Sequence, residues 1–161
     1  MNFKGMFLLV AVIALAVIMP ACWWKSKDEP SMRIANVLSA TLYDDAHITG
    51  SIHVPFEELE KIATSWNKDI PVVTYCSNYA CSASASAART LQRMGFSDVH
   101  AYEGGTAEWK QLGYPVTGKA EQGYLEHKME KPDEHDDSVI EAKDLLAMMH
   151  EKGLLEDEAA A

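Results

Sequence analysis

The sequence has little positive charge and few cysteines. Only 14 of its 161 residues are lysine or arginine, against 24 aspartates and glutamates, and the formal net charge is −10. No basic stripe is present to displace counterions from a phosphate backbone, which argues against nucleic acid as a partner. No C-x-x-C pair or H-E-x-x-H pattern occurs either, which argues against a zinc site, and no internal repeat is visible. The three cysteines cannot all pair within one chain.

The acidic charge is concentrated at the carboxyl end. Residues 119–161 hold 13 acidic and 5 basic residues, a net charge of −8. The segment KMEKPDEHDDS, residues 128–138, is typical of a solvated linker. Beyond it, apolar residues recur at helical spacing, and we predict a helix that begins at a capping box of Ser138 with Glu141 and ends at Gly153. This helix is a candidate surface for a protein partner.

The amino terminus carries a long apolar run. Lys4 precedes fourteen apolar residues, 6–19, and then Pro-Ala-Cys, an arrangement typical of a secretory signal peptide. The segment MPAC resembles a bacterial lipobox, which would make Cys22 a lipidated residue. Alternatively, the uncharged run of 20 residues from 5 to 24 is long enough to serve as a membrane anchor. We therefore expect residues 1–22 to be a signal peptide or anchor and residues 23–31 a linker, with the rest exported to the periplasmic or cell-surface side and held at a membrane.

Between residues 32 and 118 the pattern alternates between strand and helix. Short β-branched or apolar runs predict strands at 32–38, 51–55, 70–76 and 98–102. Helical spacing and terminating glycines predict helices at 56–66, 82–95 and 104–113. This alternation predicts an α/β fold, with a small parallel sheet that carries helices on both faces.

Cys76 ends the most apolar of the predicted strands. Ligands gather at the carboxyl ends of parallel strands, and residues 77–81 lead directly into a helix. Backbone N–H groups at the start of that helix would face the Cys76 sulfur and lower the pKa of its thiol. Ser82 is a candidate N-cap, and Cys81 lies five residues after Cys76. The pattern leaves open whether Cys76 is a reacting thiolate, half of a disulfide with Cys81, or a small buried residue.

Residues 72–118 resemble the active-site region of single-domain rhodaneses. VVTYCSNYACSASASAARTLQRMG is similar to the active-site strand, loop and helix of that family, GG-x-x-x-W and GYPV follow as in its signature, and HITGSIHVP at residues 47–55 is similar to its upstream element. The resemblance covers about residues 32–118. It implies a rhodanese-like fold, Cys76 as the sulfur-carrying nucleophile, a small sulfur donor (thiosulfate, a polysulfide or a persulfide), a thiol acceptor, and no cofactor or metal. The implied substrate-binding loop comprises Ser77, Asn78, Tyr79, Ala80 and Ser82.

The loop departs from the family pattern. The family has a glycine and a basic residue where this chain has Tyr79 and Cys81, so the loop reads C-x4-C, and it has Asp and Arg where this chain has Asn36 and Leu38. Without the loop arginine, we expect weak binding of anionic thiosulfate. The persulfide cradle of the family consists of backbone N–H groups and does not depend on these side chains.

Three classes of function follow from these features. In a persulfide carrier, Cys76 takes a sulfane sulfur and hands it to a thiol, and Cys81 can resolve the persulfide by forming a Cys76–Cys81 disulfide. In a thiol–disulfide redox protein, the same two cysteines act without sulfur cargo. In a binding module, the substitutions have removed catalysis. A phosphatase of related fold would need C-x5-R, and position 82 is serine.

The resemblance also predicts supporting roles. The first strand and helix of the family have almost no sequence here, and we expect the tail helix to dock on the sheet face that they would cover. We interpret His47 and His53 as structural, residues 103–105 as a tight turn beside the active loop, and Tyr79 as either a residue at the pocket mouth or an exposed turn residue.

Overall fold

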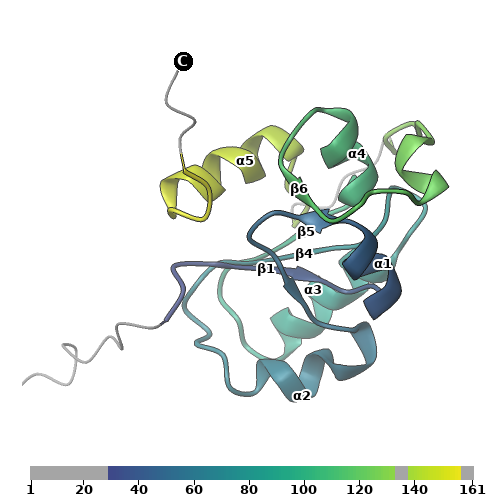
Figure 1. The fold of residues 1–161 in the computed structure, drawn as a ribbon. Coiled ribbons are helices and arrows are strands. Elements are labelled where there is room, and N and C mark those ends of the chain that lie inside the picture. Colours follow the sequence, from purple (N-terminus) through teal and green to yellow (C-terminus); the bar gives the residue numbers. More distant parts are fainter. Residues whose placement is uncertain (1–28, 133–137, 157–161) are drawn as a thin grey trace, which may run out of the picture.

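The computed structural model describes residues 29–132 and 138–156. Within these ranges β1 (Arg33–Asn36), β3 (Ile52–His53), β4 (Val72–Tyr75) and β5 (Val99–Tyr102) form a parallel sheet in the order β3–β1–β4–β5 (Figure 1). The predicted parallel α/β sheet is thereby confirmed. Strand β4 is central and buried on both faces, which explains why its sequence is a continuous apolar and β-branched run.

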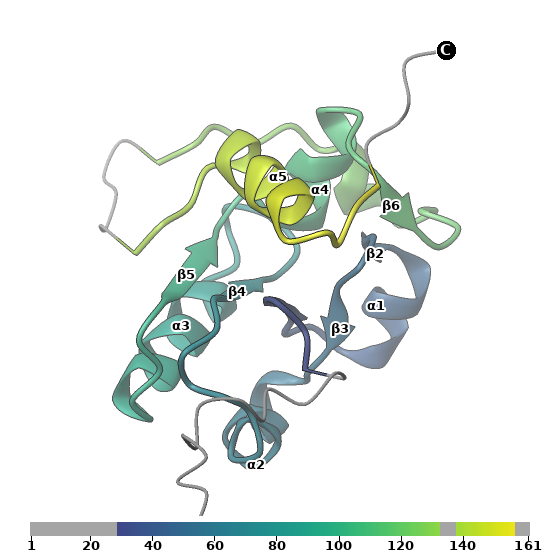
Figure 2. The same ribbon diagram turned by 90° about the vertical axis from the view of Figure 1, so that its left-hand side faces the viewer.

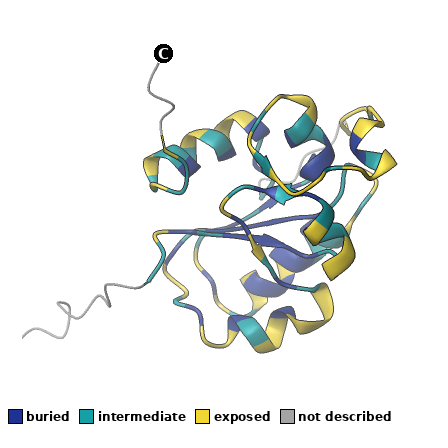
Figure 3. Ribbon diagram, viewed as in Figure 1, coloured by how far each residue is buried: buried dark blue, intermediate teal, exposed yellow. Residues whose placement is uncertain are grey.

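Helices cover both faces of the sheet (Figure 2). One face carries α2 (Leu59–Ala63) and α3 (Ala83–Arg93), and the other carries α4 (Gly105–Gln111) and α5 (Ala142–Glu151). Strands β1, β4 and β5 between these layers are largely buried, and the outward surfaces of the helices are exposed (Figure 3). The remaining elements are shorter: α1 (Ala40–Asp45), β2 (His47–Ile48), η2 (Phe56–Glu58), β6 (Val116–Thr117) and η3 (Gly123–Glu126).

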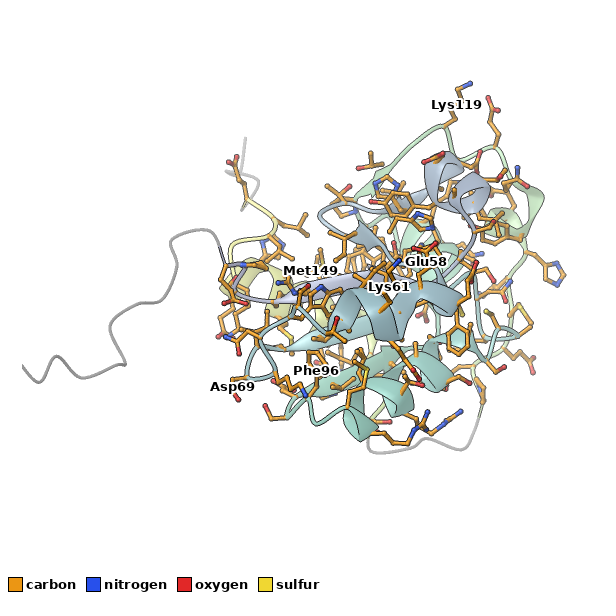
Figure 4. The ribbon with its side chains drawn as sticks, turned by 90° about the horizontal axis from the view of Figure 1, so that it is seen from below. Glu58, Lys61, Asp69, Phe96, Lys119 and Met149 are labelled. Atoms are coloured by element: carbon orange, nitrogen blue, oxygen red, sulfur yellow. The ribbon has the colours of Figure 1, made fainter. Side chains whose placement is uncertain are left out.

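The α3 face packs closely because the helix presents small residues to the sheet. Ser84, Ala87 and Ala88 are buried, and the Thr74 hydroxyl of β4 donates to the Ser84 carbonyl at 2.8 Å. Larger apolar side chains fill the space around this contact, among them Leu59, Trp66, Leu91 and Phe96, the last of which is labelled in Figure 4. The helix stops before Gly95, whose positive φ of 90° suits a residue without a side chain.

Helix α5 completes the core on the opposite face. Leu145 and Met149 are fully buried and belong to one apolar cluster with Val73 of β4 and Trp109 of α4. The tail helix therefore docks on the sheet, on the face opposite α3. The chain before α5 also extends the sheet, since the Ala101 N–H donates to the Ser138 carbonyl at 2.8 Å and the Ile140 N–H donates to the Ala101 carbonyl at 3.0 Å.

The predicted capping box of α5 is wrong. The helix begins later, its N-cap is Glu141, and that side chain makes no capping hydrogen bond. Ser138 instead lies beside the edge of β5, because backbone pairing with Ala101 holds this segment extended. The predicted end of the helix is correct, since Gly153 follows it with a φ of 71°.

Some elements had no counterpart in the prediction. Helix α1 and the antiparallel pair of β2 with β6 were not expected. The histidines lie beside these elements in structural positions. His47 Nδ1–H donates to the Tyr43 carbonyl at 2.8 Å and its ring stacks on the Tyr43 ring, and His53 Nε2–H donates to the Leu38 carbonyl at 2.8 Å.

The predicted signal peptide or anchor and the candidate lipidation site Cys22 lie outside the described residues, as does most of the 23–31 linker. Within the described ranges, no helix has both the length and the apolar character needed to cross a bilayer.

Candidate active site

The loop after β4 folds back so that its two cysteines meet. The Asn78 side-chain oxygen accepts from the Ala80 N–H at 3.1 Å, and the Asn78 carbonyl accepts from the Cys81 N–H at 3.0 Å. These two bonds form a tight turn of the kind that asparagine favours. As a result Cys81, five residues along the chain, returns to the side chain of Cys76.

Cys76 is sealed inside the loop. Its side chain is 0% exposed, and its Sγ lies 3.0 Å from the Cys81 carbonyl oxygen and 3.5 Å from the Ser84 hydroxyl. A carbonyl oxygen can only accept a hydrogen bond, so this contact holds the Cys76 thiol in its protonated form. Donation to the Cys81 sulfur, together with burial, raises the pKa of Cys76 well above its ordinary value.

Cys81 occupies the opposite environment. It is partly exposed, and the Cys76 thiol and the backbone N–H groups of Ala83 and Ser77 all favour its thiolate form. The hydrogen bond from Cys76 is the largest cause that lowers the pKa of Cys81, to about 5, and the backbone donors add to it. The loop does depress a thiol pKa, as the sequence predicted, but at Cys81. The prediction that the lower pKa lies on Cys76 is wrong, because Cys76 is buried against an acceptor. Both cysteines are free thiols.

The turn before α4 supports the loop from behind. The Thr106 N–H donates to the Cys76 carbonyl and the Ala107 N–H donates to the Ser77 carbonyl, both at 3.0 Å. Gly105, with a φ of 63°, makes this approach possible, since a Cβ there would lie 2.5 Å from the Cys76 carbonyl oxygen. The predicted tight turn beside the active loop is therefore present.

Tyr79 is tied to the body of the domain. Its hydroxyl donates to Glu108 Oε1 at 2.8 Å, and the Tyr102 hydroxyl donates to Glu108 Oε2 at 2.8 Å. One carboxylate from α4 thus holds the middle of the loop and the end of β5 together. Burial and the charge of Glu108 raise the pKa of Tyr79 above its ordinary value. Tyr79 is therefore not an exposed turn residue.

A groove lies beside this contact, with a volume of about 390 Å³. Asn78 and Tyr79 of the loop, Leu112 at the C-cap of α4 and the segment 126–129 are among the residues that line it. This position agrees with the interpretation of Tyr79 as a residue at the mouth of a pocket. Neither cysteine lines the groove.

The other predicted loop residues are placed as follows. Ala80 is exposed, and Ser82 is exposed at the N-cap position of α3, although its hydroxyl makes no capping hydrogen bond. At the positions of the missing family charges, Asn36 is fully buried and accepts from the Leu38 N–H at 2.9 Å, so it closes the end of β1. Arg89, which hydrogen-bonds to Ser86 on the exposed side of α3, does not replace the loop arginine.

Two contributors to the site were missed from the sequence. Glu108 reaches the loop because α4 follows a glycine turn. In the sequence, the only sign of this contact is a carboxylate four residues after Gly104, which is a weak signal. Ser84 lies in a run of alternating serine and alanine that packs against the sheet, and its hydroxyl lies 3.5 Å from the Cys76 sulfur. Among the residues that the structure describes, no cluster of three or more histidine, cysteine or carboxylate groups could hold a metal ion.

Comparison with known proteins agrees with this geometry. The family model of the rhodanese-like domain matches residues 20–112, so the chain belongs to the rhodanese-like family. It is 30% identical over 87 residues to the thiosulfate sulfurtransferase GlpE of Coxiella burnetii, and this alignment covers 54% of this chain and 79% of GlpE. It is 32% identical over 97 residues to YrkF of Bacillus subtilis, a protein named as a proposed sulfur carrier. This alignment covers 60% of this chain and 48% of YrkF.

Solved structures show the same relationship. The BH2092 protein of Bacillus halodurans superposes with a TM-score of 0.52 at 26% identity, covering 56% of this chain and 66% of that one. A rhodanese-like domain from Anabaena superposes with a TM-score of 0.51 at 27% identity, covering 70% of this chain and 83% of that domain.

Proposed function

We propose that this protein is a persulfide-forming sulfurtransferase, in which Cys76 carries a sulfane sulfur and passes it to an acceptor thiol. The observation that carries the proposal is the position of Cys76 at the carboxyl end of the central strand, where the turn at Asn78 brings Cys81 back against its sulfur. Membership of the rhodanese-like family and the similarity to named sulfurtransferases support it.

The chemistry needs two exchanges. A thiolate attacks the sulfane sulfur of the donor, a new S–S bond forms, and the rest of the donor leaves with the electron pair. The acceptor thiolate then attacks the outer sulfur and restores the cysteine. Cys81 offers a side path, since it can attack the Cys76 persulfide, release sulfide and leave a Cys76–Cys81 disulfide.

The loop lacks a cation that could bind an anionic donor. The segment from Cys76 to Ser82 contains no lysine or arginine. The charges of Glu108, Glu141 and Glu103 all act on Tyr79 and raise its pKa, so the field at the loop is negative. Both thiosulfate and polysulfide are anions and are disfavoured by this field, but a polysulfide or a small persulfide gives up sulfane sulfur to a thiolate by simple thiol exchange, and we expect it to be the better donor.

Intact mass after exposure to a donor tests the function. The full-length chain carrying Cys22→Ala, purified in mild detergent, is reduced and treated with inorganic polysulfide or with thiosulfate. We expect a product one sulfur atom heavier, formed faster with polysulfide, that reverts when an acceptor thiol is added and releases sulfide. A Cys76→Ser/Cys81→Ser double variant should stay at background. Loss of two hydrogens without sulfur gain would instead support the redox protein, and no change of either kind would support the binding module.

We also propose that the chain is exported and held at a membrane by residues 1–22. The apolar run, the preceding lysine and the MPAC segment support this location. After cell fractionation, the chain should sediment with membranes and be digested by protease added to spheroplasts. Release of a Cys22→Ala variant would favour a lipid anchor, and its retention would favour a spanning one. An intact chain in the cytosolic fraction would contradict the proposal.

A further inference from the structure

Solvent reaches the two cysteines unequally. Cys76 has no exposed surface, while Cys81 is partly exposed at the start of the helix. A donor that arrives from solution can therefore touch the Cys81 sulfur without any rearrangement of the loop. To touch Cys76, it would have to displace Cys81, whose carbonyl lies 3.0 Å from the buried sulfur.

The surroundings of the two sulfurs favour a negative charge on the same residue. The thiol of Cys76 and the N–H groups of Ala83 and Ser77 lower the pKa of Cys81. The Cys76 sulfur faces the Cys81 carbonyl, which can only accept. The reactive thiolate and the accessible sulfur thus coincide at Cys81.

We infer that sulfur enters at Cys81 and is relayed to Cys76. The inference rests on the proposed sulfurtransferase function and adds the order of the two thiols. In this relay, Cys81 acts while sulfur is loaded onto the protein. In the resolving role described above, Cys81 would act only after Cys76 already carries the sulfur.

The relay balances in two steps. The Cys81 thiolate attacks a sulfane sulfur of the polysulfide, its S–S bond to that sulfur forms, and the shortened polysulfide leaves as an anion with the electron pair. Cys76 then gives its proton to the outer sulfur of the Cys81 persulfide and attacks that sulfur. The bond from the outer sulfur to Cys81 breaks, so Cys76 holds the persulfide and Cys81 is a thiolate again. No external oxidant or reductant is consumed.

The second step has a favourable leaving group. When the Cys81 thiolate departs, it returns to the N–H groups of Ser77 and Ala83 that stabilise it before the reaction. A leaving thiol of low pKa departs faster in thiol exchange. The sulfur then lies on the residue that the loop shields from solvent, where stray thiols reach it less easily.

Time-resolved mapping tests the order. The full-length chain with Cys22→Ala is mixed with inorganic polysulfide, quenched with an alkylating reagent and digested with chymotrypsin. Cleavage after Tyr75 and Tyr79 separates the two cysteines onto different peptides. We expect the added sulfur on Cys81 first and on Cys76 later. Cys76→Ser should trap it on Cys81, and Cys81→Ser should load Cys76 about tenfold or more slowly.

A control and a second readout guard against a disturbed loop. Gln92→Ala, an exposed change on helix α3 outside the loop, should keep the order and rate of the parent chain. In the resting parent protein, limiting iodoacetamide should modify Cys81 about tenfold or more faster than Cys76. Loading of Cys76 before Cys81 in the parent, or equally fast loading in Cys81→Ser, would overturn the relay and leave the sulfurtransferase function standing. Absence of sulfur gain in every protein would overturn both.

Discussion

Replacing Gly105 with alanine is expected to lower the free energy of unfolding by about 2–5 kcal/mol and to abolish sulfur loading. The residue has a φ of 63°, so any L side chain there is strained. A Cβ would also lie 2.5 Å from the Cys76 carbonyl oxygen and 2.7 Å from the Asn78 nitrogen. Both atoms belong to the backbone of the active loop, and relief of the clash must move the loop itself. Urea unfolding and the polysulfide mass assay measure the two effects.

Gly113→Ala is the matched control. Gly113 also has a positive φ, of 78°, but an added Cβ would meet nothing within 4 Å. This substitution carries the backbone strain alone, about 1–2 kcal/mol, and should leave sulfur loading intact. If the two variants lost stability equally and both kept their activity, the contact between Gly105 and the loop would have no functional weight.

Leu145→Ala is expected to cost about 2–5 kcal/mol of stability. Its side chain is 0% exposed and packs between α5 and the sheet in the cluster that holds Met32, Val73 and Trp109. Truncation of the side chain removes apolar contacts and leaves a cavity between α5 and the sheet. Equilibrium denaturation in urea, with the midpoint and slope compared with those of the parent chain, gives the loss.

Lys143→Ala is the matched control, because Lys143 lies in the same helix α5 but is exposed. This substitution should change the free energy of unfolding by no more than about 0.5 kcal/mol. Equal midpoints for the Leu145 and Lys143 variants would show that α5 is not part of the cooperative unit. That outcome would also remove the explanation for how the chain covers this sheet face.

The sequence predicted the elements whose signals are local. The apolar run of β4 and the helix ending before Gly95 each carry their pattern within about a dozen residues. The pair of β2 with β6 was missed because each strand has two residues, and their partners lie far apart in the sequence. The capping box at Ser138 was wrong for a related reason: pairing with Ala101, a distant residue, decides the conformation there.

Within the site, the sequence identified the residues but not their protonation. Cys76 was recognised from its place at the end of an apolar strand, and its role and the glycine turn from the resemblance to the rhodanese family. The reversal of the two pKa values depends on which sulfur faces a carbonyl and which faces N–H groups, and that depends on how the turn at Asn78 closes. The bridge from Tyr79 through Glu108 to Tyr102 joins three separate elements, so no stretch of sequence contains it.

The short pairing of Val139 with Ala101 bears on how molecules of this protein behave at high density. Strand β5 is the last strand of its sheet, and an unpaired edge of this kind can recruit a strand from a neighbouring chain. Here the segment around Val139 already uses the Ala101 N–H and carbonyl groups. The acidic tail therefore blunts an aggregation-prone edge, and shortening the chain before residue 138 would unmask it.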